Sequence, residues 1–222
     1  MPDRWITFDC FGTLVDWHTG FTTILRPVLG NDTARLINAY HKYERQVEAE
    51  RPHRLYRAVL VTSLLRAAQE LDLPLSESDA RRLPDSWGTL PVFPDVPAAL
   101  TALRAAGCKL GVLTNCDDDL FAQTQKALGL KLDLVVTAER VHDYKPSLSH
   151  FRYFSRTSGA DHAHWTHAAC SIFHDLEPAA SLGLRRIWID RDKTGENPGP
   201  GVIRLTSAAG LVQSFGLDAC QP

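Results

Sequence analysis

The chain has 222 residues, of which 44% are hydrophobic and 23% charged, a balance typical of soluble globular proteins. The 24 basic and 26 acidic side chains give a formal net charge of -2, and no block of like charge stands out, so a nucleic-acid partner is not expected. Five cysteines, the last of them Cys220, form no C-x-x-C pair, which argues against both a disulfide framework and a zinc knuckle. The apolar stretches are too short to span a membrane, and the start M-P-D-R-W has no signal pattern. We therefore expect a cytoplasmic protein without a membrane partner.

The first part of the chain predicts one strand followed by a helical block. Residues 4–9 read as a short buried strand, whereas residues 17–92 contain no convincing strand and indicate three or four amphipathic helices. These helices are expected over residues 31–50, which start with the capping sequence N-D-T, over residues 53–72, and after Ser76, with Asp79 as an imperfect capping partner. The stretch P-V-F-P-D-V-P, residues 91–97, reads as a stiff linker.

Strand and helix patterns alternate after this linker. Strands are expected over residues 109–115, 132–137, within 165–175, 185–190 and 202–206. Helices are expected over residues 96–106, 118–128, 147–158 and 177–182. This alternation predicts an α/β fold with a parallel sheet covered by helices on both faces. Residues 1–16 and 93–222 would form this core, and residues 17–92 would form an inserted helical cap.

Histidines cluster in the run D-H-A-H-W-T-H, residues 161–167. Such a run resembles a metal site at first sight. It precedes a predicted strand and has no further ligand set nearby, so we interpret it as a solvated loop.

Polar side chains stand at the carboxyl ends of the predicted strands, where α/β sheets gather their reactive groups. These residues are Asp9, Thr114, Asn115, Lys145, His174 and Asp175. Two carboxylates, an ammonium, a hydroxyl and an amide can perform covalent hydrolysis: one carboxylate attacks the substrate and forms an ester. The second carboxylate, positioned by the lysine, would activate the water that splits this ester.

Four ordered motifs then identify a family resemblance. The stretches F-D-C-F-G-T-L, V-L-T-N, Y-K-P and S-I-F-H-D-L-E-P-A resemble the motifs of the haloacid dehalogenase superfamily in order and spacing. The resemblance implies a Rossmann-like core with a helical cap. It also implies Asp9 as the nucleophile, Thr114 as the anion-holding hydroxyl, Lys145 as the charge-balancing ammonium and Asp175 as the acid of the fourth motif.

Two positions indicate a metal-independent member. Phosphatases of the superfamily carry a second aspartate two places after the nucleophile, and here Phe11 stands there, which cannot transfer a proton. Their fourth motif holds Mg²⁺ with two acids, and Ser171 stands in the place of the first of them. The alternative is a phosphatase that recruits Mg²⁺ with Asp9 and Asp175 alone.

The metal-free branch that the chain resembles is the 2-haloacid dehalogenases of the (S) type. By this resemblance Asp9 would displace halide from the carbon beside a carboxylate, and water would hydrolyse the ester to a 2-hydroxy acid. No cofactor is needed, and the partner is a small carboxylic acid, whose carboxylate would meet Thr114 and nearby amides. Related proteins are often dimers, so the resemblance leaves a homodimer open.

The chain departs from this branch at two places. Dehalogenases of this branch have an arginine that cradles the leaving halide. Ungapped counting places Tyr40 at that position here, with His41 beside it, and the nearest arginine on the same predicted helix is Arg45. The stretch C-S-I, residues 170–172, replaces S-S-N, and His174 replaces an aromatic residue before the acid. Handling of the leaving group and of the water is therefore expected to differ.

A second resemblance fits these departures. The stretches D-C-F-G-T-L-V-D-W-H-T-G, T-N-C-D and H-D-x-x-P-A are similar to azetidine-2-carboxylate hydrolase, whose leaving group is a tethered amine and needs no halide cradle.

A non-catalytic binding module is a third hypothesis. The residues expected around the substrate are Cys10, Phe11, Trp17, Tyr40, Arg45, Asn115 and His174. For Cys10, strand alternation points the side chain into the core instead.

Overall fold

The computed structural model describes residues 3–215 and shows a single six-stranded sheet. The strand order is β3-β2-β1-β4-β5-β6, and every neighbouring pair is parallel. The strands are β1 (Trp5–Phe8), β2 (Lys109–Thr114), β3 (Leu134–Thr137), β4 (Trp165–Ala169), β5 (Arg185–Ile189) and β6 (Val202–Leu205). The predicted parallel α/β sheet is confirmed, with β1 at its centre. Cys220 lies outside the described residues.

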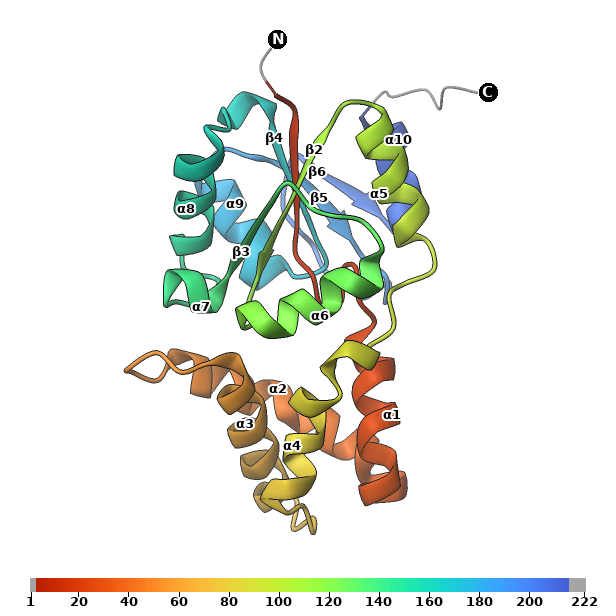
Figure 1. Ribbon diagram of the computed structural model, residues 1–222, viewed down its shortest axis with the longest axis vertical. Helices are drawn as coiled ribbons and strands as arrows, with labels where there is room; N and C mark the ends of the chain where they lie inside the picture. Colours follow the sequence, from red (N-terminus) through yellow and green to blue (C-terminus); the bar gives the residue numbers. More distant parts are fainter. Residues whose placement is uncertain (1–2, 216–222) are drawn as a thin grey trace.

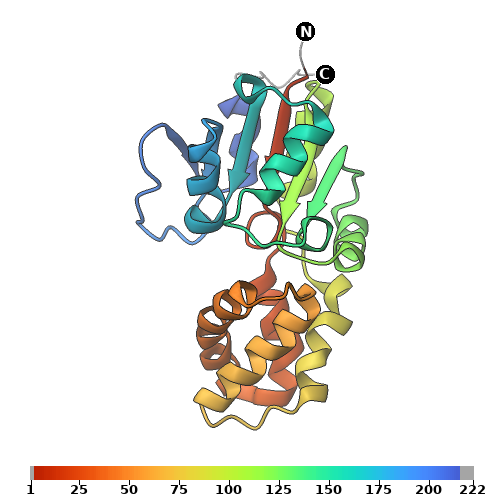
Figure 2. The same cartoon turned by 90° about the vertical axis from the view of Figure 1, so that its left-hand side faces the viewer.

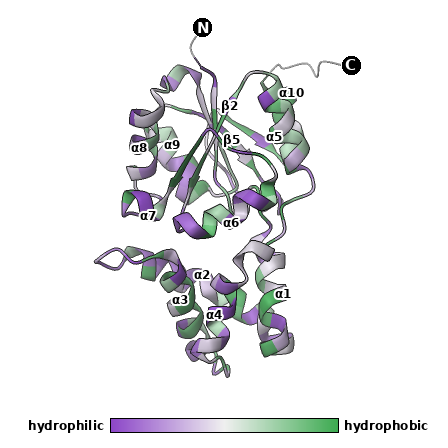
Figure 3. Ribbon diagram, in the orientation of Figure 1, coloured by the Kyte–Doolittle hydropathy of each residue, from purple (hydrophilic) through white to green (hydrophobic). Residues whose placement is uncertain are grey.

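Helices cover both faces of this sheet (Figure 1). One face packs on α5 (Val96–Ala105), α6 (Asp118–Leu128) and α10 (Leu211–Ser214), and the other on α8 (Ser149–Ser158) and α9 (Glu177–Ser181). The alternation of side chains along β1 separates the two layers: Ile6 and Phe8 join the first cluster, and Trp5 joins the second. Figure 3 shows hydrophobic residues concentrated along the central strands, as burial on both faces requires.

A group of four helices lies apart from the sheet, beyond the carboxyl ends of its strands (Figures 1 and 2). These helices are α1 (Trp17–Leu29), α2 (Thr33–Ala49), α3 (Tyr56–Glu70) and α4 (Glu77–Asp85). Each buries an apolar stripe against its neighbours, including Leu25 of α1, Leu36 of α2 and Leu64 of α3. The helical character predicted for this segment is confirmed, and α1 is the helix for which no separate range was predicted.

The chain passes between the sheet and the four helices twice, and the two connecting segments run side by side. Val15 forms an antiparallel bridge with Val92, and the Asp16 amide donates to the Pro91 carbonyl at 2.8 Å. The residues predicted as a stiff linker therefore include one of these connecting segments, before α5 begins at Val96.

Local signals predicted the helix ends with mixed success. The Ser76 hydroxyl accepts from the Asp79 amide at 3.1 Å, which confirms that cap. Gly129 and Gly159 end α6 and α8 in the left-handed conformation that favours glycine. The N-D-T cap is wrong, because a 3-10 turn, Gly30–Asp32, precedes α2 and no side chain caps that helix.

The segment after β4 also differs from expectation. A short π-helix, Ile172–Leu176, separates β4 from α9 and carries His174 and Asp175. In the histidine run only the 3-10 turn His162–His164 matches the solvated loop that the sequence predicted. His167 lies inside β4 and is fully buried, so for this residue the interpretation is wrong.

The remaining elements are the short helix α7 (Ala138–Val141) and the 3-10 turns Trp87–Thr89 and Ala208–Gly210. Within residues 3–215, no helix combines the length and the apolar character that crossing a membrane would need.

Candidate active site

Three charged side chains meet at the carboxyl edge of the sheet, and we call Asp9, Lys145 and Asp175 the ion cluster. Lys145 Nζ donates to Asp9 Oδ1 at 2.9 Å, to Asp175 Oδ1 at 2.6 Å and to the Leu113 carbonyl at 2.8 Å. All three donor positions of the ammonium are thus used. Asp9 follows β1, the central strand, and Asp175 belongs to the π-helix after the neighbouring β4, so the sheet order brings the two carboxylates together.

The second oxygen of Asp9 is held by the turn that follows the strand. Thr13 Oγ1 donates to Asp9 Oδ2 at 2.8 Å and accepts from the Cys170 amide at 2.8 Å. Gly12 permits this turn because its φ is +90°, and a Cβ there would come within 2.8 Å of Cys170 Sγ. The turn therefore fixes the orientation of the Asp9 carboxylate through its second oxygen.

Burial and mutual charge set the protonation of the ion cluster. Burial alone would lower the pKa of Lys145, but the Asp175 and Asp9 carboxylates outweigh it and raise that pKa, so the lysine stays charged. Burial would likewise raise the pKa of Asp175, but the Lys145 charge and a hydrogen bond from His167 lower it to about 2. Near neutral pH Asp175 is therefore an ionised carboxylate.

Asn115, at the end of β2, holds the segment that carries Lys145. Its Oδ1 accepts from the Lys145 amide at 2.8 Å, and its Nδ2 donates to the Lys145 carbonyl at 3.1 Å. The same Nδ2 donates to Glu48 Oε1 at 3.2 Å, across to α2. Asn115 thus links the lysine, the sheet edge and the four-helix group.

The π-helix places two further groups beside the ion cluster. The Ser171 hydroxyl accepts from the His174 amide at 3.0 Å and lies 3.1 Å from His174 Nδ1. Burial lowers the pKa of His174, so its ring is neutral near pH 7. Asp175 Oδ2 is buried and has no hydrogen-bond partner among the described residues, which is costly for a carboxylate unless a ligand or water meets it.

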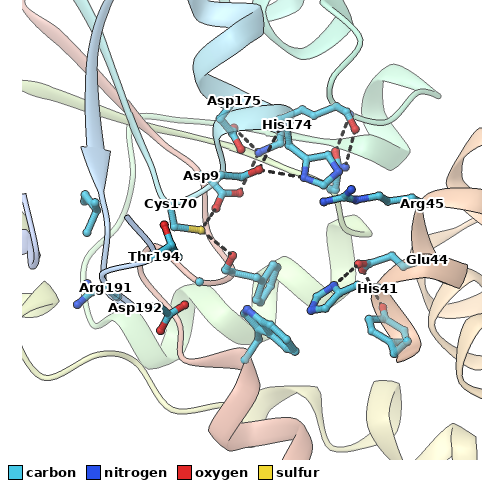
Figure 4. A pocket seen from close by; sticks show the side chains of 18 of the residues that line it. Asp9, His41, Glu44, Arg45, Cys170, His174, Asp175, Arg191, Asp192 and Thr194 are labelled. Carbon is cyan, nitrogen blue, oxygen red and sulfur yellow. Dashed lines mark hydrogen bonds and ion pairs between the residues drawn. The ribbon is translucent and has the colours of Figure 1, made fainter. Parts of the chain in front are cut away.

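These groups face a cavity of about 330 Å³ between the sheet edge and the four helices. Its volume is at the lower end for ligand sites and suits a small molecule. Aromatic rings make up part of the cavity lining: Phe11, Trp17, Phe21, Tyr40, Tyr56, Trp87 and Trp188. Figure 4 shows Asp9, Asp175 and His174 on one side and His41, Glu44 and Arg45 on the side of the four helices.

One face of α2 supplies the polar side chains opposite the ion cluster, and we call these five residues the α2 wall. They are Tyr40, His41, Glu44, Arg45 and Glu48, at the spacing of one helical face. Arg45 projects toward His174 and Asp9 (Figure 4), and its guanidinium lies 5.1 Å from the centroid of the exposed Phe173 ring.

The pKa values of the two glutamates of the α2 wall shift in opposite directions. Burial would raise the pKa of Glu44, but hydrogen bonds with His41, Tyr56 and Tyr40 lower it. Glu48 is only 8% exposed, and burial together with the nearby Glu44 charge raises its pKa. The cavity therefore faces one ionised and one more readily protonated carboxyl on this side.

The structure brings most of the predicted site residues together. Those that line the cavity are Asp9, Phe11, Trp17, Tyr40, Arg45, Asn115, Lys145, His174 and Asp175. Cys10 does not line it; the side chain is fully buried in the core, because alternation along β1 turns it away. Its expected contact with substrate is corrected accordingly. Thr114 is fully buried beneath the cavity with its hydroxyl on Cys116 Sγ, at 3.6 Å, and its role as an anion-holding hydroxyl stays a prediction.

Sequence reasoning missed several residues of the site. Thr13 lies within the first motif, yet its bond to Asp9 depends on the turn geometry. Glu44 and Glu48 share a helical face with Tyr40, a spacing visible in the sequence, but the sequence did not show that this face meets the ion cluster. His167 was interpreted as part of a solvated histidine run, although the strand expected within residues 165–175 includes it, and its Nε2 lies 3.0 Å from Asp175 Oδ1.

The arrangement fits a covalent reaction better than a divalent-metal site. The Lys145 ammonium contacts one oxygen of each carboxylate, Thr13 donates to the second oxygen of Asp9, and Ser171 brings no charge, so few charged oxygens are left for a divalent cation. Across residues 3–215, no cluster of three or more His, Cys, Asp or Glu side chains has the arrangement to hold a metal ion. The ion cluster can instead hold one carboxylate for attack and leave the other with a free oxygen for water.

Comparisons with known proteins place this site in a family. The model for haloacid dehalogenase-like hydrolases matches residues 4–164. Haloacetate dehalogenase H-2 of Moraxella sp. (strain B) is 23% identical over 87% of this chain and 90% of its own length. (S)-2-haloacid dehalogenase 1 of Pseudomonas sp. (strain CBS-3) is 28% identical over 65% of this chain and 66% of its own length.

A solved structure agrees in fold. The L-2-haloacid dehalogenase from Xanthobacter autotrophicus with chloropropionic acid covalently bound superposes with a TM-score of 0.81 at 15% identity, over 98% of this chain and all of that one. Because the family model spans most of the chain and its matched range includes Asp9 and Lys145 of the ion cluster, this protein belongs to the haloacid dehalogenase-like hydrolases.

Proposed function

We propose that the protein is a metal-independent hydrolase of small 2-haloacids, of the (S)-2-haloacid dehalogenase type. The observation that carries the proposal is a single ammonium, Lys145, bonded to both Asp9 and Asp175 at the edge of a cavity of about 330 Å³ that Arg45 also lines. The relatives named for haloacetate and (S)-2-haloacid dehalogenation support the substrate class.

In the first step the Asp9 carboxylate attacks C2 of the substrate. The new bond joins an Asp9 oxygen to C2, while the bond from C2 to the halogen breaks and its electron pair leaves with the halide. Thr13 and Lys145 hold the two Asp9 oxygens, so the carboxylate is oriented before the substrate arrives. Arg45 lines the cavity from the opposite side and would stabilise the departing anion.

In the second step water attacks the Asp9 carbonyl carbon. Asp175 takes a proton from this water through Oδ2, since Lys145 already occupies Oδ1. The bond from the Asp9 carbonyl carbon to the substrate oxygen then breaks, and the alkoxide takes up a proton and leaves as a 2-hydroxy acid. Overall, one water is consumed and one halide and one proton are released.

Residues 17–92 would act as the cap in this scheme, and residues 1–16 and 93–222 as the core. Two observations support this division: the connecting segments at Val15 and Val92 run side by side, and the α2 wall closes the cavity opposite the ion cluster. A cytoplasmic location and a homodimer stay predictions from the sequence.

Single turnover in H₂¹⁸O tests the proposal. Enzyme in excess over (S)-2-chloropropionate should take ¹⁸O into the peptide that contains Asp9, and the first lactate formed should carry unlabelled oxygen. Label found only in the product would contradict an aspartyl ester. Asp161→Asn, an exposed surface change, is the control and should label as the unaltered protein does.

The α2 wall favours a second candidate, the opening of a carbon–nitrogen bond similar to that of azetidine-2-carboxylate hydrolase. Glu44 and Glu48 flank Arg45, and carboxyl groups suit an amine leaving group better than a halide. A panel of 2-chloro, 2-bromo and fluoro acids, azetidine-2-carboxylate and 4-nitrophenyl phosphate, each with and without chelator, separates the candidates. Phosphatase activity that chelator abolishes would instead establish the magnesium-dependent alternative.

A further inference from the structure

A buried chain of hydrogen bonds runs through the sheet to the back of Asp175. Trp165 Nε1 donates to Thr7 Oγ1 at 2.7 Å, Thr7 Oγ1 lies 2.8 Å from His167 Nδ1, and His167 Nε2 lies 3.0 Å from Asp175 Oδ1. Thr7, His167 and Asp175 are all fully buried. The register pairs Thr7 of β1 with His167 of β4, so the sheet itself holds the two side chains next to each other.

The direction of these bonds follows from the donors available. Trp165 Nε1 can only donate, so Thr7 Oγ1 accepts from it and has one hydrogen of its own to give. The acceptors in reach of that hydrogen are His167 Nδ1 at 2.8 Å and the Thr166 carbonyl at 3.5 Å, and the shorter contact is the stronger one. The ionised Asp175 carboxylate can only accept, so Nε2 carries the proton that points at it, and in the neutral ring Nδ1 is then the acceptor for the Thr7 hydroxyl.

This donor has a consequence for the two oxygens of Asp175. Oδ1 accepts from both Lys145 Nζ and His167 Nε2, whereas Oδ2 has no partner among the described residues. Two donors on Oδ1, from different directions, keep the Asp175 carboxylate group from rotating. They leave Oδ2 as the oxygen able to accept a hydrogen bond from water.

We propose that His167 is a positioning residue for ester hydrolysis: held with its proton on Nε2 by Thr7, it fixes Oδ1 of Asp175 so that Oδ2 receives the proton of the attacking water. The kinetic part of this inference rests on the proposed function, since it assigns His167 to the second step and not to the first. His167 does not line the cavity, so it acts on the reaction only through Asp175.

Nuclear magnetic resonance tests the bond direction without any substrate. Protein labelled with ¹⁵N in its histidines should show the His167 ring with the proton on Nε2 and an unprotonated Nδ1, and His167→Gln assigns that signal by removing it. Buried His150, whose Nε2 lies 3.2 Å from the Thr114 carbonyl, should give a similar signal that this variant leaves in place. Replacing Thr7 by valine removes the donor to Nδ1 and should shift the Nδ1 resonance. A proton found on Nδ1 in the unaltered protein would overturn the inference.

The kinetic test compares a variant that lacks the donor with one that keeps it. In His167→Leu ester hydrolysis should slow on the order of 10- to 100-fold, because a small misplacement of the acid is costly. kcat for (S)-2-chloropropionate then falls while kcat/KM stays within about threefold, since ester formation precedes the affected step. Mass spectrometry of the intact protein during turnover should show the substrate ester accumulating on Asp9.

His167→Gln is the matched variant, because its amide nitrogen can reach the place of Nε2 and donate to Asp175. It should restore most of kcat and abolish the accumulation of ester. A purely structural role predicts instead that both variants lose kcat and kcat/KM together, and that result overturns the inference. If the unaltered protein turns over no haloacid, the proposed function fails, and the resonance measurement alone decides the direction of the His167 bond.

Discussion

The two sides of the cavity are built in different ways. On the core side every charged atom of the ion cluster but one has a hydrogen-bond partner, and the bonds join β1, the π-helix and the segment that carries Lys145. On the opposite side the α2 wall comes from a single helix, and two of its members, His41 and Arg45, are exposed.

This difference indicates that the two sides of the cavity have different roles in the reaction. A rigid cluster in which all charged atoms but one are paired suits groups that must keep one geometry through two chemical steps. A single helix face on a separate group of helices can change its side chains without disturbing the sheet, so it suits the choice of leaving group. The predictions below test whether losses on the core side abolish the reaction and losses on the α2 wall alter its selectivity.

Asp9→Asn should have the largest effect on activity. The amide is a poor nucleophile, so halide release from 2-chloropropionate should fall by about 10⁴-fold or more. Halide-selective electrode measurements with Asp161→Asn as the control report this directly. Activity close to that of the unaltered protein would show that Asp9 is not the nucleophile. Absence of activity in the unaltered protein too would favour the non-catalytic binding module.

Lys145→Met should have the largest effect on stability. It leaves two buried carboxylates without their counter-charge, and breaking such a cluster by removing one partner costs about 3–5 kcal/mol. Urea unfolding measures the loss, and Lys126→Met on exposed α6 surface should change stability by about 0.5 kcal/mol or less.

A double variant separates charge from packing in this experiment. Adding Asp175→Asn to Lys145→Met removes one of the stranded charges and should recover part of the lost free energy of unfolding. If the double variant is no more stable than Lys145→Met, packing of the lysine stem and not charge balance dominates.

The core side was largely predictable from the sequence, and the reason is geometric. Strand periodicity placed Asp9 at a strand end, and parallel strands bring such ends to one edge. The order of the four motifs added Lys145 and Asp175, which the structure brings into direct contact. Alternation also gave the core position of Cys10.

The α2 wall and the histidine behind Asp175 were not predictable in the same way. Helical spacing shows that Tyr40, Glu44 and Glu48 share a face, but which surface this face meets depends on how the four helices sit on the sheet. His167 looks like one more member of a polar run, and only the pairing of β1 with β4 reveals Thr7 beside it. The π-helix likewise has no simple sequence signal.

Arg45→Leu tests the α2 wall directly. Loss of the guanidinium should lower kcat/KM for 2-chloropropionate by about tenfold, the value of a charge-assisted hydrogen bond at a partly exposed site. Arg35→Leu, on the same helix and paired only with exposed Asp32, is the matched control and should leave kcat/KM unchanged. Equal turnover in both variants would show that Arg45 holds no leaving group and would favour the carbon–nitrogen candidate.

Glu48→Gln is expected to have the smallest effect on turnover and a distinctive effect on stability. Burial raises the pKa of Glu48 in the folded protein above the value of about 4.3 that it has when unfolded. Above that value the unfolded state loses the proton that the folded state retains, so this group makes the protein less stable as pH rises from about 4.3 to the folded pKa.

Glutamine removes this loss, because it cannot ionise and can still accept from Asn115 through the same oxygen. The variant should therefore match the unaltered protein near pH 4 and exceed it in free energy of unfolding near pH 7, with haloacid turnover changed by less than about threefold. Urea titrations at several pH values measure the difference. A variant that is less stable at pH 7 than at pH 4, relative to the unaltered protein, would mean that the fold lowers the pKa of Glu48, so that the group is ionised at pH 7. The α2 wall would then present two negative charges to the substrate, which would disfavour a halide leaving group and favour an amine.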